Sequence, residues 1–124
     1  MRYLVDGMNL IGSRPDGWWR DRPGARRALV AALAALATEH EVVVVFDGRP
    51  EPEEVDEAAG RNITARFAPG GPNAADEAIA EAVAQDADPT SLVVVSSDGA
   101  LVRRVRALGA EVLGTGSFRR LLDG

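Results

Sequence analysis

VVVVFDG, residues 42–48, opens with an unbroken apolar, mostly β-branched run and ends with an acid and a glycine. A run without polar residues at alternate positions predicts a strand that is covered on both faces, as in a parallel sheet. Two other stretches repeat the pattern, YLVDG at residues 3–7 and SLVVVSSDG at residues 91–99. The chain is therefore expected to contain at least three buried strands, each followed closely by an aspartate.

Helical patterns separate these strands. The expected helices are residues 25–39, 51–61, 74–87, 99–109 and 117–123, and further strands are expected at residues 63–68 and 110–114. Asp21 and Asn73 are expected to cap the helices that follow them. This alternation predicts an α/β fold, a single domain over residues 1–124 with about five mainly parallel strands between two layers of helices.

The composition restricts the chemistry that this chain can perform. It has no cysteine and one histidine among 124 residues, which excludes thiolate and histidine-rich metal sites. A bound metal is therefore expected to be a hard cation held by oxygen atoms. All 14 cationic residues are arginine, so Schiff-base chemistry and a P-loop lysine are excluded. No signal peptide or membrane-spanning run is evident, and we expect a cytoplasmic protein without a membrane partner.

Acidic residues gather at one predicted edge of the sheet. Asp6, Asp47 and Asp98 follow three of the strands, and Asp76 and Glu77 lie in the first turn of a helix. The carboxyl ends of parallel strands share one edge, where ligands bind if the strand order reverses. Clustered carboxylates repel one another unless a divalent cation lies between them. Such a cation, most simply Mg²⁺, lowers the pKa of water and stabilises charge on a phosphoryl oxygen.

Each acid also has a local interpretation. Asp6 and Asp47 precede glycines and could form simple turns, with Gly7 letting the chain leave its strand sharply. Asp98 has the position of a helix N-cap, and Asp76 lies at capping-box spacing from Asn73. Taken together, however, acids at the ends of three strands favour a metal site over independent turns and caps.

The stretches YLVDGMNLIG, VVVVFDG, NAADEAI, VVVSSDGAL and GAEVLGTGSFRRLL resemble the NYN domain, in particular its YacP-like branch. The resemblance runs in register over nearly the whole chain. It implies a three-layer α/β/α fold of the PIN-like nuclease class and endonuclease activity, dependent on Mg²⁺ or Mn²⁺, on RNA. Carried over residue by residue, it implies catalytic roles for Asp6, Asn9, Asp76 and Asp98. The implied metal ligands are Asp6, Asp47, Asp76 and Asp98, with Glu77 as a less secure neighbour.

Other residues are candidates for substrate contacts. Ser96 and Ser97 could position a phosphate or water, or cap the following helix. Arg14, Trp18 and Arg20 lie in a loop where aromatic and cationic side chains could stack bases and hold phosphates. The alternative is that one tryptophan covers the core while the arginines are solvated. GTGSF, residues 114–118, could bind a phosphate through backbone N–H groups or form a simple turn.

The sequence therefore predicts a metal-dependent endoribonuclease that hydrolyses RNA phosphodiester bonds, with structured or ribosome-associated RNA as its partner. The first alternative is a non-catalytic RNA-binding or interaction module on the same fold, which Gly99 favours because a longer polar side chain is expected after Asp98. The second is a nucleotide-binding α/β domain, which the missing glycine fingerprints disfavour. The oligomeric state is left open, a homodimer included.

Overall fold

In the computed structural model, which describes residues 1–52, 54, 62–71 and 73–123, the predicted parallel sheet is present. Its described strands are β1 (Arg2–Asp6), β2 (Glu41–Asp47), β3 (Ile63–Ala68), β4 (Leu92–Val95) and β5 (Glu111–Leu113), all pairing in parallel. The predicted strand at residues 63–68 agrees at both ends. Most of the helix predicted at residues 51–61 lies outside the described residues.

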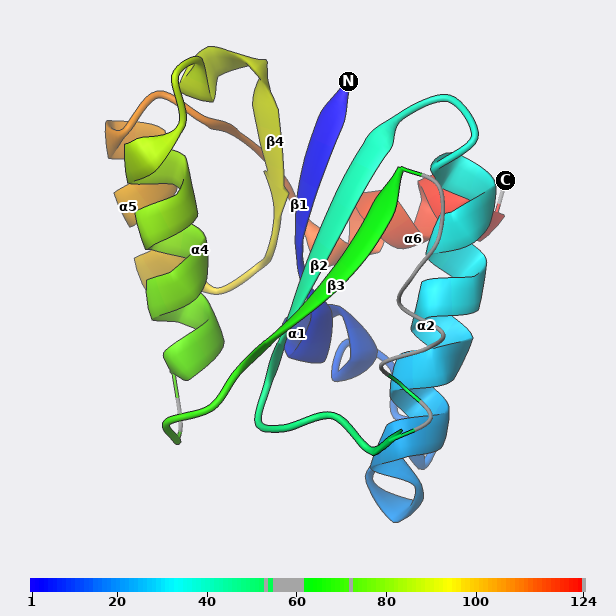
Figure 1. Cartoon of the computed structure of the whole chain (residues 1–124). Coiled ribbons are helices and arrows are strands. Elements are labelled where there is room, and N and C mark those ends of the chain that lie inside the picture. The colour runs from blue at the N-terminus through cyan, green and yellow to red at the C-terminus, as the bar shows by residue number, and fades with distance from the viewer. Residues whose placement is uncertain (53, 55–61, 72, 124) are drawn as a thin grey trace.

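Helices cover both faces of the sheet, which confirms the three-layer α/β/α architecture (Figure 1). One layer holds α4 (Ala74–Gln85) and α5 (Gly99–Ala107), and the other holds α1 (Gly7–Ile11), α2 (Arg22–Leu36) and α6 (Thr115–Asp123). Short 3₁₀ helices, η1 (Trp18–Arg20) and η2 (Pro89–Ser91), lie in the connections. None of the described helices is both long enough and apolar enough to cross a membrane.

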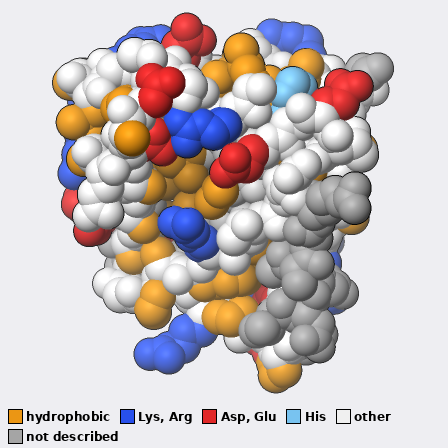
Figure 2. Space-filling model, turned by 45° about the horizontal axis from the view of Figure 1, so that its top comes forward, with side chains coloured by type: hydrophobic (Ala, Val, Ile, Leu, Met, Phe, Trp, Pro, Cys, Tyr) orange, Lys and Arg blue, Asp and Glu red, His pale blue; other side chains and the backbone are white. Residues whose placement is uncertain are grey.

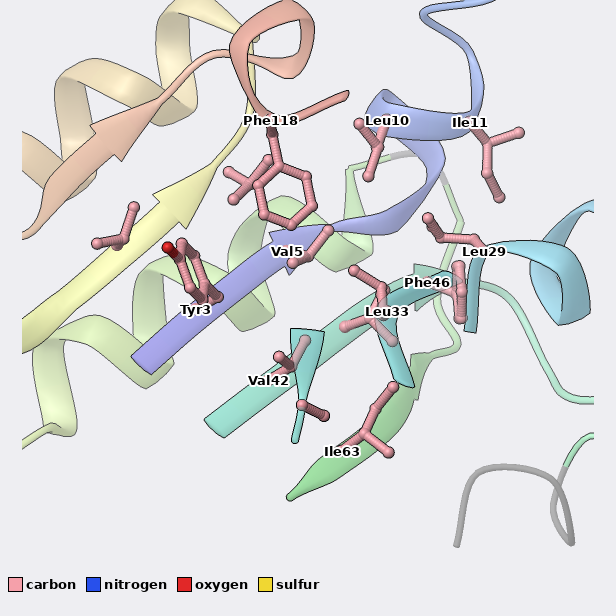
Figure 3. Packing of buried hydrophobic residues seen from close by; sticks show 14 residues of the cluster. Tyr3, Val5, Leu10, Ile11, Leu29, Leu33, Val42, Phe46, Ile63 and Phe118 are labelled. Atoms are coloured by element: carbon pink, nitrogen blue, oxygen red, sulfur yellow. The ribbon is translucent and has the colours of Figure 1, made fainter. Parts of the chain in front are cut away.

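Alternate residues of the central strands pack into two separate cores. Tyr3 and Val5 of β1 face α2 and α6, where they join Leu33, Phe46 and Phe118 in one buried cluster (Figure 3). Leu4, between them, faces the other way and packs in the cluster built around α4 and α5. Because both faces of β1, β2 and β4 are buried, these strands have continuous apolar runs, whereas the edge strand β3 alternates, with Thr64 and Arg66 exposed.

The order of the strands, β3-β2-β1-β4-β5, places β1 at the centre. The chain adds β2 and β3 on one side of β1, then crosses back to place β4 and β5 on the other side. The reversal lies between β1 and β4, whose registers pair Val5 with Val95. Asp6, which ends β1, and Ser96, which directly follows β4, therefore meet at the point where open α/β sheets bind ligands.

Helix α1 is absent from the sequence-based prediction, which gives a turn after Asp6 and then a loop or irregular short helix from residue 11. It contains only five residues, too few for a helical period to be recognised, although Leu10 and Ile11 are buried. Gly7 begins this helix directly after β1, so the chain leaves its strand abruptly at this residue, without a positive φ. Glycine is needed there for space, because an added Cβ would lie 2.5 Å from two ring carbons of Phe46.

Gly7 and Gly99 give a matched test of this packing, since each follows an aspartate and begins a helix. Gly7→Ala is expected to lower the free energy of unfolding by about 1–3 kcal/mol, because the new methyl group overpacks the core. Gly99→Ala is expected to be neutral or slightly stabilising, because its Cβ meets only the flexible end of Arg103, at 3.4 Å. Urea denaturation measures both, and equal effects would contradict the close approach to Phe46.

Candidate active site

Asp6 is the buried centre of the acidic edge. It is the last residue of β1, and only 4% of the residue is exposed. The hydroxyl of Ser96, itself fully buried at the end of β4, donates a hydrogen bond to Asp6 Oδ2 over 3.0 Å. The carboxylate is therefore held in one orientation by the neighbouring strand.

Asn9 fastens α1 to the loop that follows β4. Its side-chain oxygen accepts a 2.8 Å hydrogen bond from the backbone N–H of Ser97 and lies 3.4 Å from the Ser96 hydroxyl. The Ser96 oxygen also accepts a hydrogen bond from the backbone N–H of Asp98, at 3.1 Å. Ser96 thus connects Asp6 with the backbone that carries Asp98, and Asn9 orients the same loop.

Two of the acids also act as helix caps. Asp98 Oδ1 accepts hydrogen bonds from the N–H groups of Ala100 and Leu101, at 3.0 and 3.1 Å, as its N-cap position predicts. Asp47 Oδ1 accepts a 2.9 Å hydrogen bond from the N–H of Ala75, in the first turn of α4. Asn73 occupies the expected N-cap position of α4, but its side chain makes no capping hydrogen bond. Asp47 and Asp98 therefore cap helices and also belong to the acidic edge of the sheet.

Asp76 and Glu77 are adjacent in sequence but differ in environment. Asp76 is partly buried, and its carboxylate accepts no hydrogen bond within the described part of the chain. Glu77 is exposed and forms an ion pair with Arg104 of α5, with an N–O distance of 2.7 Å. Asp76 is thus available to a ligand at the sheet edge, whereas Glu77 is engaged on the surface between α4 and α5.

The acids influence one another electrostatically. Burial raises the pKa of Asp6 to about 6, and the charges of Asp76 and Asp47 add to this effect, while hydrogen bonds from Ser96 and Asn9 oppose it. Burial also raises the pKa of Asp76, with contributions from Asp98, Asp47 and Glu77, against a smaller opposing effect of Arg104. The fold therefore places these carboxylates close enough to resist simultaneous ionisation, which a bound cation relieves.

The donor chemistry of this edge fits a hard divalent cation. Within the described residues, however, no three acidic or histidine side chains converge closely enough to enclose an ion. This arrangement suits Mg²⁺, which usually keeps several waters and is held by one or two carboxylates together with substrate phosphates. The residues thus fit a cation that is completed by solvent and substrate, rather than a closed protein cage.

A second polar link at this edge escaped the sequence analysis. Ser97 Oγ accepts a 2.9 Å hydrogen bond from the N–H of Thr115 and lies 2.9 Å from the Thr115 hydroxyl. Thr115 is buried and begins α6, so the GTGSF segment leads directly into a helix. The only sequence signal for this contact was the position of GTGSF after the last strand. The link ties α6 to the loop that carries Asp98.

The tryptophan-arginine loop lies between α1 and the start of α2, at the end of the molecule where β1 finishes (Figure 1). Trp18 packs partly buried against the core, and the Arg22 guanidinium lies 5.1 Å from its ring centroid. Trp19 is 50% exposed, with Arg20 at 5.9 Å, and Arg14 forms an ion pair with Asp123. The more accessible aromatic is therefore Trp19, although Trp18 was the predicted contact.

The opposite end of the molecule has a separate hollow. Figure 2 shows apolar side chains there, bordered by arginine and acidic residues. This pocket is lined by the beginnings of the strands, including Arg2, Glu41 and Leu92, and by Arg66 and Asp86. Since Asp6, Asp47 and Asp98 lie at or beyond the ends of their strands, this pocket is not part of the candidate active site.

Comparisons with known proteins agree with the fold and with the family that the sequence resembles. The sequence profile of the YacP-like NYN domain matches residues 3–123. The crystal structure of Rae1 (YacP) from Bacillus subtilis is similar at 24% identity, with a TM-score of 0.77, over 99% of this chain and 74% of Rae1. A mutant of Rae1 is similar at 25% identity, with a TM-score of 0.76, over 98% of this chain and 74% of that chain. No curated protein matches the chain.

Proposed function

The chain belongs to the YacP-like NYN domain family, and from this we propose that it is a metal-dependent endoribonuclease. The fold of this family is nuclease-like, and its members generally use divalent metals. The proposed reaction is hydrolysis of RNA phosphodiester bonds with Mg²⁺ or Mn²⁺. The proposed substrate is structured or ribosome-associated RNA in the cytoplasm. The net charge of −5 supports a structured partner over loose attraction to bulk RNA.

One observation carries this proposal. Asp6 is buried at the reversal point of the sheet, and the charge of Asp76 raises its pKa further. A purely structural aspartate gains nothing from like charges nearby, whereas a site for a divalent cation requires them. The hydrogen bond from Ser96 shows that the fold holds this costly carboxylate in a defined orientation.

Asp6, Asp76 and Asp98 are the residues that we assign to cation binding. A bound divalent cation supplies a Lewis acid for phosphoryl oxygens and lowers the pKa of water. Ser96 orients Asp6, and Asn9 holds the loop that carries Asp98. The carboxylates of Asp76 and Asp98, both partly buried, can also accept hydrogen bonds from a water molecule and so direct it toward a phosphate.

The tryptophan-arginine loop is proposed to contact the RNA substrate. Trp19, with Arg20 beside it, offers an exposed ring on which an unpaired base can stack. Arg14 and the half-buried Trp18 complete the same loop, and Ser97 lies exposed between Asn9 and Thr115. These groups supply contacts to RNA that do not depend on the overall charge of the chain.

Cleavage of a labelled structured RNA, with Mg²⁺, Mn²⁺ or EDTA, tests the proposed function. We expect cleavage with either cation and none with EDTA. Asp98→Asn is expected to reduce cleavage about 100-fold, because the amide is a poor cation ligand. The fold is expected to survive, since asparagine caps helices as well as aspartate does. Cleavage in EDTA, or full activity of Asp98→Asn, would contradict the mechanism.

A non-catalytic RNA-binding module is the second candidate. It is favoured by the absence, among the described residues, of three acids that converge on one point. Filter binding and cleavage measured on the same RNA separate the two candidates. Tight binding that is unaffected by EDTA, without cleavage under either cation, would support the module.

A further inference from the structure

Helix α4 depends on a distant residue to complete its first turn. Its N-cap residue, Asn73, has a left-handed backbone (φ 69°) and makes no side-chain capping bond. The N–H of Ala75 instead donates to Asp47 Oδ1, which lies 28 positions earlier at the end of β2. The cap that helices normally receive from their own N-terminal residue is therefore supplied here by the sheet.

The connection before α4 does little to fix the helix start by itself. Gly70, Gly71 and Asn73 all have positive φ, a backbone conformation that glycine and asparagine adopt without forming a regular element. Ala75, in contrast, is buried and packs in the cluster of α4 and α5. The bond from Asp47 therefore acts at a packed position, immediately before Asp76 in the chain.

We propose that Asp47 is a positioning residue, which acts by fixing the first turn of α4 and so places the Asp76 carboxylate beside Asp6. This inference rests on the proposed function, in which Asp76 takes part in cation binding. It gives Asp47 a role distinct from the direct metal ligand that the family resemblance implies. The role requires an oxygen that accepts a hydrogen bond at this position and does not require a negative charge.

Asp98 provides the contrast that supports this assignment. Asp98 caps its own helix through two local N–H groups, so its side chain and its helix are neighbours in sequence. Asp47 instead caps a helix through the N–H of a residue 28 positions later in the chain. Of these two caps, the Asp47 bond is therefore the one that couples the sheet to the first turn of α4, next to Asp76.

The matched pair Asp47→Asn and Asp47→Ala tests the proposal, with Asp76→Asn as the reference for loss of a ligand. Asparagine keeps an acceptor oxygen and removes the charge, whereas alanine removes both. We expect Asp47→Asn to cleave RNA at a rate within about threefold of the wild type, and Asp47→Ala to lose about 10–100-fold. If Asp47→Asn instead falls to the level of Asp76→Asn, Asp47 is a direct ligand and the proposal is overturned.

Hydrogen exchange of the Ala75 amide, followed by NMR without metal or RNA, gives a readout independent of activity. We expect faster exchange in Asp47→Ala, protection restored in Asp47→Asn, and unchanged protection of the β2 amides in both. Wild-type protection of Ala75 in Asp47→Ala would overturn the proposal. If the wild-type protein cleaves no RNA, the proposed function fails, and this exchange measurement still decides whether Asp47 holds the helix.

Discussion

Replacing Asp6 with asparagine is expected to reduce RNA cleavage about 10²–10³-fold while leaving the fold intact. The amide has nearly the size of the carboxylate and keeps an oxygen that accepts the hydrogen bond from Ser96. It lacks the charge that the proposed cation requires. Single-turnover cleavage at saturating Mn²⁺ measures the loss, and a variant that retains wild-type activity would remove Asp6 from the mechanism.

The same substitution is expected to stabilise the metal-free protein at neutral pH. The folded-state pKa of Asp6 is raised from 3.8 to about 6, so between these values the folded state binds more protons than the unfolded state. Wild-type stability therefore falls as the pH rises through this window and levels off above it. Asp6→Asn lacks this titration, and its advantage is expected to grow to at most about 3 kcal/mol above pH 6.

Urea denaturation between pH 4 and pH 8, in EDTA, measures this difference. The two proteins are expected to be similar near pH 4 and to diverge as Asp6 ionises in the wild type. Saturating Mn²⁺ is expected to narrow the gap at pH 7.5, because the cation stabilises the ionised wild-type site. Parallel pH profiles for the two proteins would show that Asp6 is not a strained carboxylate.

The sheet was predictable because burial on both faces leaves a direct mark on sequence. VVVVFDG and the related stretches show no polar alternation, and their spacing with helical segments allows few arrangements other than a parallel sheet. The pairing of β1 with β4 was left open by the sequence, and the structure supplies it. Helix α1 was not predictable, because five residues carry no recognisable period.

Long-range polar contacts are the part of the candidate site that sequence could not provide. The bond between Asp47 and Ala75 spans 28 positions, and the link between Ser97 and Thr115 spans 18. In both pairs, the sequence around each residue gives no indication of the residue that it contacts. Asn73 illustrates the opposite error: local sequence predicts a capping side chain, but its left-handed backbone leaves that function to Asp47.

Asp76→Asn and Glu77→Gln form the other pair of variants with a large expected contrast. Asp76→Asn is expected to lower cleavage about 100-fold or more, because it removes a partly buried carboxylate coupled to Asp98 and Asp47. Glu77→Gln is expected to retain activity within a few fold. Its side chain is exposed and bound to Arg104, and exposed ion pairs contribute little to stability.

The two positions share one helical turn and the same change from acid to amide, so local helix propensity cannot explain a difference between them. Cleavage rates and Mn²⁺ half-saturation, measured for both variants with the same RNA, give the comparison. Equal losses would mean that Glu77 leaves Arg104 and joins the site when cation and RNA bind. A loss confined to Asp76→Asn would mean that the role of a carboxylate at this edge depends on its burial and its charged neighbours. Membership of the acidic pair in the NAADEAI segment would then not be sufficient.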